Sequence, residues 1–161
     1  MALEVRLARP EEHDRVGDLT VRAYSAFTLG PADPYVAVLR DAAARAAGGE
    51  LWVAVEDGRL LGNVTYCPPG SAFREVGRED EGEFRMLAVD PDARGAGAGT
   101  ALARHCEERA LAHGARGMAL STLAEMADAH RIYRRLGYDR DPSRDWSPLP
   151  GVELLAFSKV F

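Results

Sequence analysis

The segment from Met86 to Glu108 constrains the fold more than any other part of the chain. A short apolar run ends at Asp90-Pro91, and Arg94 and three alternating glycines (Gly95, Gly97, Gly99) follow before a stretch of helical composition. This order predicts a strand, a tight turn and a helix. The first backbone N–H groups of a helix have no partner within it, and an arginine adds a charge suited to phosphate oxygens. The segment therefore predicts a phosphate-binding site.

Two common phosphate-binding motifs do not fit the spacing. A P-loop requires a lysine directly after its last glycine, and the chain's only lysine is Lys159. A dinucleotide-binding fingerprint requires Gly-x-Gly-x-x-Gly, but the sixth position counted from Gly95 is Thr100. The motif also begins beyond the middle of the chain, whereas a nucleotide-binding first strand is expected near the start of its domain. A turn whose glycines merely relieve backbone strain is the alternative that these residues leave open.

The whole string, Val89-Asp90-Pro91-x-x-Arg94-Gly95-x-Gly97-x-Gly99, resembles the acyl-CoA-binding segment of the GNAT superfamily of N-acetyltransferases. Arg94, Gly97 and Gly99 occupy the defining places of that family's pattern, Arg/Gln-x-x-Gly-x-Gly/Ala. The resemblance implies that the backbone of the strand pairs with the pantetheine arm of acetyl-CoA and that the amides of the turn hold its pyrophosphate. The residues concerned are Leu87, Ala88 and Val89 in the strand, and Arg94, Gly95, Ala96, Gly97, Ala98, Gly99 and Thr100 in the turn.

Length and composition predict one globular domain over residues 1–161. Apolar residues make up 47% of the chain and charged residues 28%. The longest charge-free runs have about half the length that a membrane span needs, and the N-terminal residues lack an apolar signal core. We therefore expect a cytoplasmic protein without a membrane partner. The net charge of −5 argues against nucleic-acid binding. Cys67 and Cys106 are too few for a disulfide scaffold, and Cys106 is expected to be a buried structural thiol.

The pattern along the chain predicts an α/β fold with a mixed central sheet and about four helices, in the order β-α-α-β-β-β-α-β-α-β-β. Asp57-Gly58 is typical of a two-residue hairpin turn. This order resembles the whole single-domain GNAT fold. The expected strands are 5–8, 51–55, 60–66, 83–89, 118–123, 138–140 and 152–161, and the expected helices begin near Pro10, Asp33, Gly99 and Met126.

Acetyl transfer from a thioester to an amine requires a base for the amine and an acid for the leaving thiolate. Tyr133 is the candidate acid, because Ala129-x-x-x-Tyr133-x-x-x-Gly137-Tyr138 resembles the family's late helix, whose tyrosine lies beside the CoA sulfur. From the residues alone, a tyrosine that only packs the helix on the sheet remains open. The family often has asparagine seven residues before this tyrosine, and here that place is Met126.

Glu83 is the candidate base, at a spacing before the motif that several family members share. The alternative is a solvated acid at the end of the acidic stretch 79–81. Strand alternation places Glu83 and Arg85 on one face, so an ion pair between them is expected to keep Glu83 charged. His130 is a less favoured base, because its helix position predicts a solvent-facing or cofactor-edge side chain.

The sequence leaves the acceptor open. By analogy with the family, Tyr24, Phe27 and Trp146 are candidates for the acceptor pocket, and the acceptor is expected to be a small-molecule or peptide amine. No metal is expected, because His105 and His113 have no metal-like companions. Neither cysteine has a base nearby in the sequence, so direct transfer in a ternary complex is favoured over an acyl-enzyme. A non-catalytic acyl-CoA-binding sensor module, a longer acyl donor and a homodimer also remain open.

Overall fold

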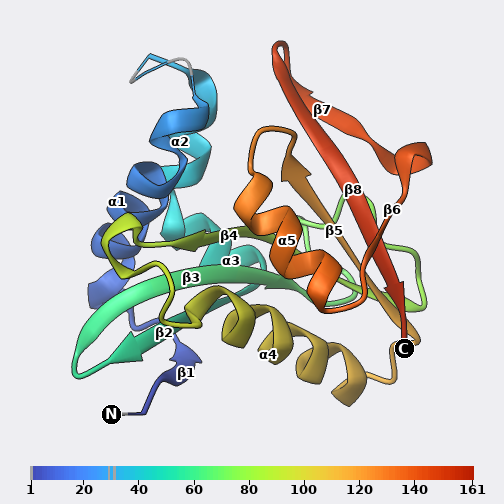
Figure 1. Ribbon diagram of the computed structural model, residues 1–161, viewed down its shortest axis with the longest axis horizontal. Coiled ribbons are helices and arrows are strands. Elements are labelled where there is room, and N and C mark those ends of the chain that lie inside the picture. Colours follow the sequence, from blue (N-terminus) through green and yellow to red (C-terminus); the bar gives the residue numbers. More distant parts are fainter. Residues whose placement is uncertain (1, 29, 31) are drawn as a thin grey trace.

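The computed structural model describes residues 2–28, 30 and 32–161, and it shows one mixed sheet with helices on both faces (Figure 1). The strands are β1 (Glu4–Leu7), β2 (Glu50–Glu56), β3 (Arg59–Cys67), β4 (Glu81–Val89), β5 (Gly117–Leu123), β6 (Asp139–Arg140), β7 (Trp146–Leu149) and β8 (Val152–Val160). The helices are α1 (His13–Tyr24), α2 (Pro34–Arg40), α3 (Ala42–Gly48), α4 (Ala98–Ala112) and α5 (Ala127–Arg135), with short 3-10 turns between some of them.

The strands follow the order β1-β2-β3-β4-β5-β8-β6, and β7 pairs with β8. All neighbours are antiparallel except β4 and β5, which run parallel. This parallel pairing is short: Glu81–Phe84 lies beside Gly117–Leu120, and both strands then continue without pairing to each other. The sheet therefore opens into a fork between the ends of β4 and β5 (Figure 1).

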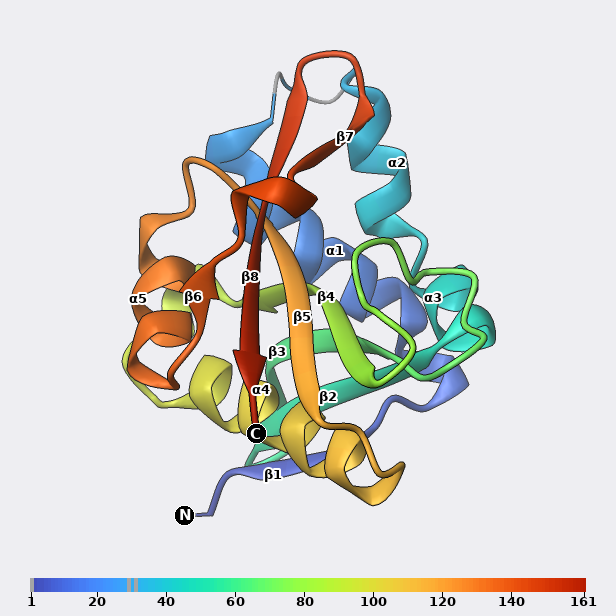
Figure 2. The same ribbon diagram turned by 90° about the vertical axis from the view of Figure 1, so that its right-hand side faces the viewer.

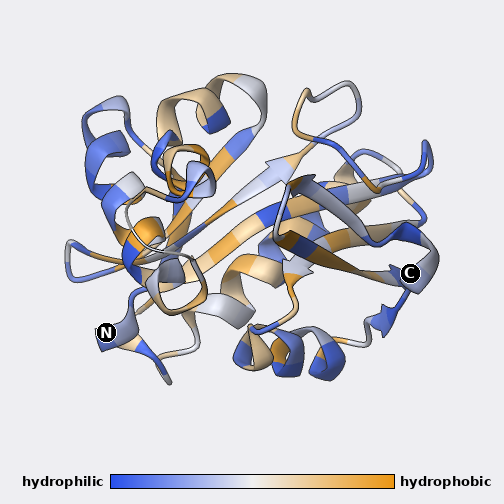
Figure 3. Cartoon of the chain, turned by 90° about the horizontal axis from the view of Figure 1, so that it is seen from above, coloured by the Kyte–Doolittle hydropathy of each residue, from blue (hydrophilic) through white to orange (hydrophobic). Residues whose placement is uncertain are grey.

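Two layers of helices bury the two faces of the sheet (Figures 1 and 2). Helices α4 and α5 cover one face, where Leu102 and Cys106 pack with Phe84 and Leu120. Helices α1, α2 and α3 cover the other. Cys106 is fully buried, as predicted. In Figure 3 the hydrophobic residues gather along the strands and on the helix faces that meet them.

The predicted fold class and order of elements are confirmed, with two additions. The second predicted helix divides at Asp41, whose backbone leaves helical geometry (φ −80°, ψ 69°) and whose side chain accepts a hydrogen bond from the Ala44 N–H at 3.1 Å. This new N-cap gives five helices rather than about four. The loop predicted at 141–150 contains β7. The hairpin at Asp57-Gly58 is confirmed, because both residues have positive φ (52° and 78°), as a tight hairpin turn requires.

None of the helices in the described part of the chain is long and apolar enough to cross a membrane.

Candidate functional site

The fork between β4 and β5 leads into a pocket of about 490 Å³. Within β4, Met86 has a positive φ of 55°, and the register with β3 shifts at this point, which bends the strand away from β5. The walls of the pocket are the end of β4, the glycine turn and the start of α5. The lining residues that the sequence singled out are Phe27, Leu87, Ala88, Val89, Arg94, Gly95, Gly97, Ala98, Gly99, Thr100, Met126 and Ala129.

The glycine turn presents unpaired backbone donors to this pocket. Gly95 (φ 88°) and Gly97 (φ 84°) adopt left-handed conformations, and a side chain added at either position would meet no atom within 4 Å. Within the described residues, the N–H groups of Gly95, Gly97, Ala98, Gly99 and Thr100 donate to no acceptor. Free donors at the start of a 15-residue helix, facing open space, fit a phosphate group.

Arginines surround the same turn. Arg94 lines the pocket and its Nη1 lies 3.4 Å from Asp128 Oδ2, while Arg131 pairs with the other oxygen of Asp128. Arg135 lines the pocket one helical turn beyond Arg131. Neither Arg131 nor Arg135 was predicted as a site residue. Their four-residue spacing places them on one face of α5, but the direction of that face depends on how α5 packs on the sheet.

Tyr133 lies on the inner face of α5 and is 3% exposed. The aromatic rings of Phe84, Phe157 and Tyr138 surround its ring at centroid distances of 5.9, 5.9 and 6.1 Å. Its hydroxyl has no hydrogen-bond partner among the described residues. Burial raises the pKa of the phenol, so the group stays protonated, which is the form that a general acid needs.

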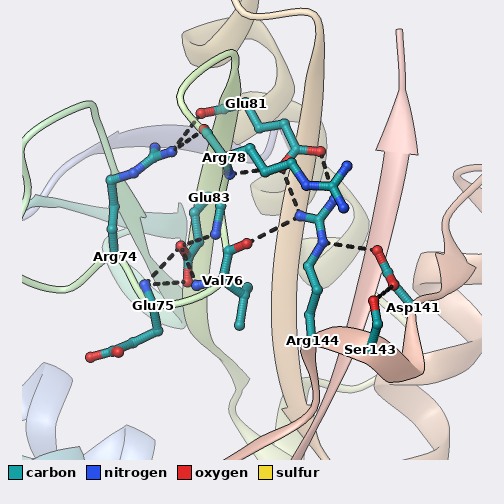
Figure 4. A network of polar contacts seen from close by, with 10 residues as sticks. Arg74, Glu75, Val76, Arg78, Glu81, Glu83, Asp141, Ser143 and Arg144 are labelled. Carbon is teal, nitrogen blue, oxygen red and sulfur yellow. Dashed lines mark hydrogen bonds and ion pairs between the residues drawn. The ribbon is translucent and has the colours of Figure 1, made fainter.

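Glu83 is fully buried in β4, and a loop wraps its carboxylate (Figure 4). The backbone N–H groups of Glu75, Val76 and Gly77 donate to its Oε1 at 2.9, 3.1 and 2.9 Å, and Oε2 accepts one longer bond from Glu75 at 3.1 Å. The expected ion pair with Arg85 is not present within the described residues, because these amides take its place. Burial raises the pKa of Glu83, and the amides and Arg85 offset part of that increase.

Two other expectations differ from the structure. The acidic stretch is not solvated throughout, since the Glu81 carboxylate pairs with Arg144 at 2.7 Å and both side chains are 10% exposed (Figure 4). His130 does not face solvent or the pocket: it is 8% exposed, its Nε2 bonds to the Leu123 carbonyl at 3.0 Å and its ring packs on Phe157. Helix α5 is tilted so that this position turns toward β8.

The three candidates for the acceptor pocket lie around the fork on the α1 side. Phe27 lines the pocket, and the Tyr24 hydroxyl lies 3.4 Å from the Leu87 carbonyl. Trp146, on β7, lies over the guanidinium of Arg85. Among the described residues, no group of three or more His, Cys, Asp or Glu side chains is placed to hold a metal ion.

The chain belongs to the acetyltransferase (GNAT) family, whose sequence profile matches residues 14–138. Its whole length also superimposes on solved structures of this class. An acetyltransferase of the GNAT family from Desulfovibrio desulfuricans aligns with a TM-score of 0.73 at 19% identity over 99% of both chains. The PaiA N-acetyltransferase from Thermoplasma acidophilum, solved in complex with coenzyme A, aligns with a TM-score of 0.71 at 13% identity over all of both chains.

Among characterised relatives, the chain is similar to the N-acetylaspartate synthetase of Rattus norvegicus, with 32% identity over 114 residues. That alignment covers 71% of this chain and 36% of the relative. Mycothiol acetyltransferase from Cellulomonas flavigena is 40% identical over 94 residues, which is 55% of this chain and 26% of that protein. The chain thus matches about a third or less of the length of these relatives.

Proposed function

We propose that the protein is an acetyl-CoA-dependent N-acetyltransferase that moves an acetyl group directly to a primary amine within a ternary complex. The observation that carries this proposal is the glycine turn. Its unpaired amides line a pocket beside the point where β4 and β5 separate. The named activities of both relatives, the synthesis of N-acetylaspartate and the acetylation of mycothiol, support the same class of reaction.

The residues of the pocket fit acetyl-CoA as the co-substrate. In this proposal, the free amides of Arg94, Gly95 and residues 97–100 bind the pyrophosphate, and Arg131 and Arg135 add positive charge beside it. The predicted donor Ala96 is not among them, because its N–H donates to the Ala93 carbonyl at 3.4 Å. Beyond Phe84, β4 has no partner strand on the β5 side, so the backbone of Leu87–Val89 is free to bond to the pantetheine arm as an added strand does. The thioester then lies at the fork, on the side of α5 that carries Tyr133.

Direct transfer is favoured because neither cysteine can act as a nucleophile. Cys67 and Cys106 are both fully buried. Burial raises the pKa of the Cys67 thiol to about 12 and also raises that of Cys106, so neither forms a thiolate near neutral pH. Within the ternary complex, we assign the protonation of the leaving thiolate to Tyr133. We assign deprotonation of the amine to Glu83, directly or through water, since Oε2 accepts only one hydrogen bond.

An amine library tests the activity. Purified protein, acetyl-CoA and individual amines are incubated, and release of free CoA thiol is followed with a thiol reagent. We expect amine-dependent release and a thermal stabilisation by CoA, because a ligand that binds the folded state stabilises it by mass action. Thermal stabilisation by CoA without thiol release in the presence of any amine would instead indicate a non-catalytic acyl-CoA sensor. If neither effect is seen, the proposal that the protein binds acetyl-CoA is also wrong.

Tyr133→Phe tests the acid with the amine that the library identifies. Loss of the proton donor should lower kcat by about 10²-fold or more, while the Kd for CoA stays within about twofold. Tyr138→Phe is the matched control, because Tyr138 is as buried as Tyr133, belongs to the same aromatic cluster and loses the same hydroxyl group. An unchanged kcat in Tyr133→Phe, with chemistry shown to be rate-limiting, would remove Tyr133 from the mechanism.

A further inference from the structure

A buried arginine lies where β4 leaves β5. Arg85 follows Phe84, the last residue of β4 that pairs with β5, and is 7% exposed. Its Nη1 donates to the Phe73 carbonyl at 3.2 Å, and its guanidinium carbon lies 5.3 Å from the centre of the Trp146 ring. Tyr35, on α2, is close enough for the charge of Arg85 to offset part of the increase that burial causes in the pKa of its phenol. These contacts are neutral. The charge of Arg85 also lowers the pKa of the buried Glu83 carboxyl, but no ion pair joins the two side chains among the described residues.

No carboxylate among residues 2–28, 30 and 32–161 forms an ion pair with Arg85. Glu83, two residues earlier on the same face, is bound by the loop amides described above. A second buried arginine on this face, Arg45, is also bound by neutral groups, including Asn63 Oδ1 at 3.0 Å and the Leu39 carbonyl at 3.0 Å. Its burial and, to a smaller degree, the charge of Arg85 lower the pKa of Arg45 to about 10.

Two other polar groups near the fork lack a partner. Ser121 is the first residue of β5 beyond the paired segment, as Arg85 is on β4. It alternates with Leu123, which packs with Tyr35 on the α1–α2 side, so Ser121 faces that side too. Within the described chain, its buried Oγ has no hydrogen-bond partner, and neither does the buried indole Nε1 of Trp146.

These donors come from three separate elements on one face of the sheet, and Arg85 and Trp146 are in contact. Arg85 comes from β4, Ser121 from β5 and Trp146 from β7, and the β7–β8 hairpin reaches the same end of the molecule as α2 (Figure 2). Burial of an unpaired charge and of unpaired donors is costly unless a ligand satisfies them. Two arginines, Arg45 and Arg85, and one acid, Glu83, are buried on this face. A carboxylate matches the fork of a guanidinium and accepts from hydroxyl and indole donors.

The distance along β4 fits a small acceptor. The Leu87 carbonyl, which the Tyr24 hydroxyl contacts, lies two residues beyond Arg85. An extended strand would separate the two residues by roughly 6–7 Å, and the bend at Met86 makes this an upper bound. If the thioester lies at the fork as proposed above, an amine at the thioester and a carboxylate at Arg85 can belong to one small molecule.

We propose that the acceptor is a primary amine that also carries a carboxylate, and that Arg85, with Ser121 and Trp146, binds this carboxylate on the α1–α2 side of the fork. This inference rests on the proposed acetyltransferase function and specifies its substrate class. It assigns to Arg85 a role in acceptor specificity rather than in binding CoA, since Arg85 lies outside the pocket that the glycine turn lines.

The test compares acceptors that differ in the carboxylate alone. L-Amino acids are paired with their α-amides, and aspartate and glutamate are also paired with asparagine and glutamine. For the preferred acceptor, we expect the acid to exceed its amide by about 10-fold or more in kcat/KM. Arg85→Met should lower kcat/KM for the acid by about 10- to 100-fold, which is the usual range for hydrogen bonds to a charged group. In the same variant, kcat/KM for the amide and the KM for acetyl-CoA should both stay within about twofold of the wild-type values. Arg85→Lys should recover part of the loss, because it restores charge without the fork.

Arg15→Met is the matched control, since the Arg15 side chain is 62% exposed and lies on the outer side of α1. Amide turnover by Arg85→Met shows that the variant is folded. If acids and amides are acetylated equally, or if Arg85→Met lowers both alike, the inference is wrong while the acetyltransferase function stands. If no amine is acetylated, the proposed function fails, and calorimetric titration of the CoA-bound protein with the same pairs decides the inference. Binding of the acid but not of the amide supports it, and equal binding or no binding overturns it.

Discussion

At the scale of single residues, the Glu83 carboxylate both holds a loop in place and is our candidate for the general base. Three loop amides bind it, which fixes the loop over the start of β4, and burial moves its pKa above the ordinary value of 4.5. A general base that works near neutral pH benefits from such an increase. The same amides limit that increase, because they stabilise the charged form.

For Glu83→Gln, we expect kcat/KM to fall by about 10²-fold and the acid limb of its pH profile to disappear. The wild-type limb should lie above pH 4.5, because the carboxyl must lose its proton to act and its pKa is raised. Steady-state kinetics between pH 5 and 9 measure this. Glu75→Gln makes the same change in charge on an exposed side chain of the loop and should leave the profile unchanged. An unaltered acid limb in Glu83→Gln would leave Glu83 with a purely structural role.

At the scale of elements, the two glycines that flank α4 allow the effect of backbone strain to be distinguished from the effect on ligand binding. Gly97 precedes the helix with φ 84°, and Gly114 follows it with φ 78°; at both positions a side chain would meet no atom within 4 Å. Alanine at either position is therefore strained by a similar amount, about 1 kcal/mol. Gly97 differs from Gly114 in one respect, because its neighbouring amides face the pocket.

We expect Gly97→Ala and Gly114→Ala to lower the free energy of unfolding equally, by about 1 kcal/mol in urea titrations. Only Gly97→Ala should lower the affinity for CoA, by about 10-fold or more in calorimetric titration, because its methyl group would occupy the space in front of the amides that we propose bind the pyrophosphate. Equal CoA affinities in the two variants would show that the turn does not bind the cofactor.

At the scale of the whole molecule, Arg144 joins the C-terminal strands to the loop before β4 (Figure 4). Its Nη1 donates to Glu81 Oε1 at 2.7 Å and to the Val76 carbonyl at 3.1 Å. Burial alone would raise the pKa of Glu81, but the hydrogen bonds from Arg144 and from the Arg78 N–H outweigh it and hold the pKa below its usual value. The same loop carries the amides that bind Glu83, so this contact supports the fork from outside.

Arg144→Met should lower the free energy of unfolding at pH 7 by about 3 kcal/mol, because it leaves Glu81 buried without its cation. The folded pKa of Glu81 is depressed, so the stabilisation is complete above about pH 4.5 and is lost as the pH falls through the folded value. The difference between the two proteins should therefore shrink below pH 4.5. Urea denaturation at pH 7 and in this acid range measures it, with Arg15→Met as the exposed control, expected within about 0.5 kcal/mol of wild type. A difference that does not change with pH would exclude the ion pair as its cause.

The parts of the molecule that the sequence predicted are those encoded by local pattern. The strand, turn and helix around Gly97 follow from the order of apolar residues, glycines and helix formers, and the hairpin follows from Asp57-Gly58. The spacing of Ala129, Tyr133 and Gly137 likewise placed Tyr133 on a late helix. Family membership followed from the same local string, because its residues are adjacent in the chain.

What the tertiary structure decided is which distant residues meet. The amides that bind Glu83 come from a loop whose sequence has no helical or strand periodicity, so the sequence did not predict them. They take the place of the expected ion pair with Arg85. The tilt of α5 turned His130 inward and Arg131 and Arg135 toward the pocket. The gathering of Arg85, Ser121 and Trp146 depends on the fork between β4 and β5 and on the return of β7. Such contacts arise from strand pairing and packing across the whole chain. The sequence by itself determined the elements and the glycine turn, because those depend on neighbouring residues alone.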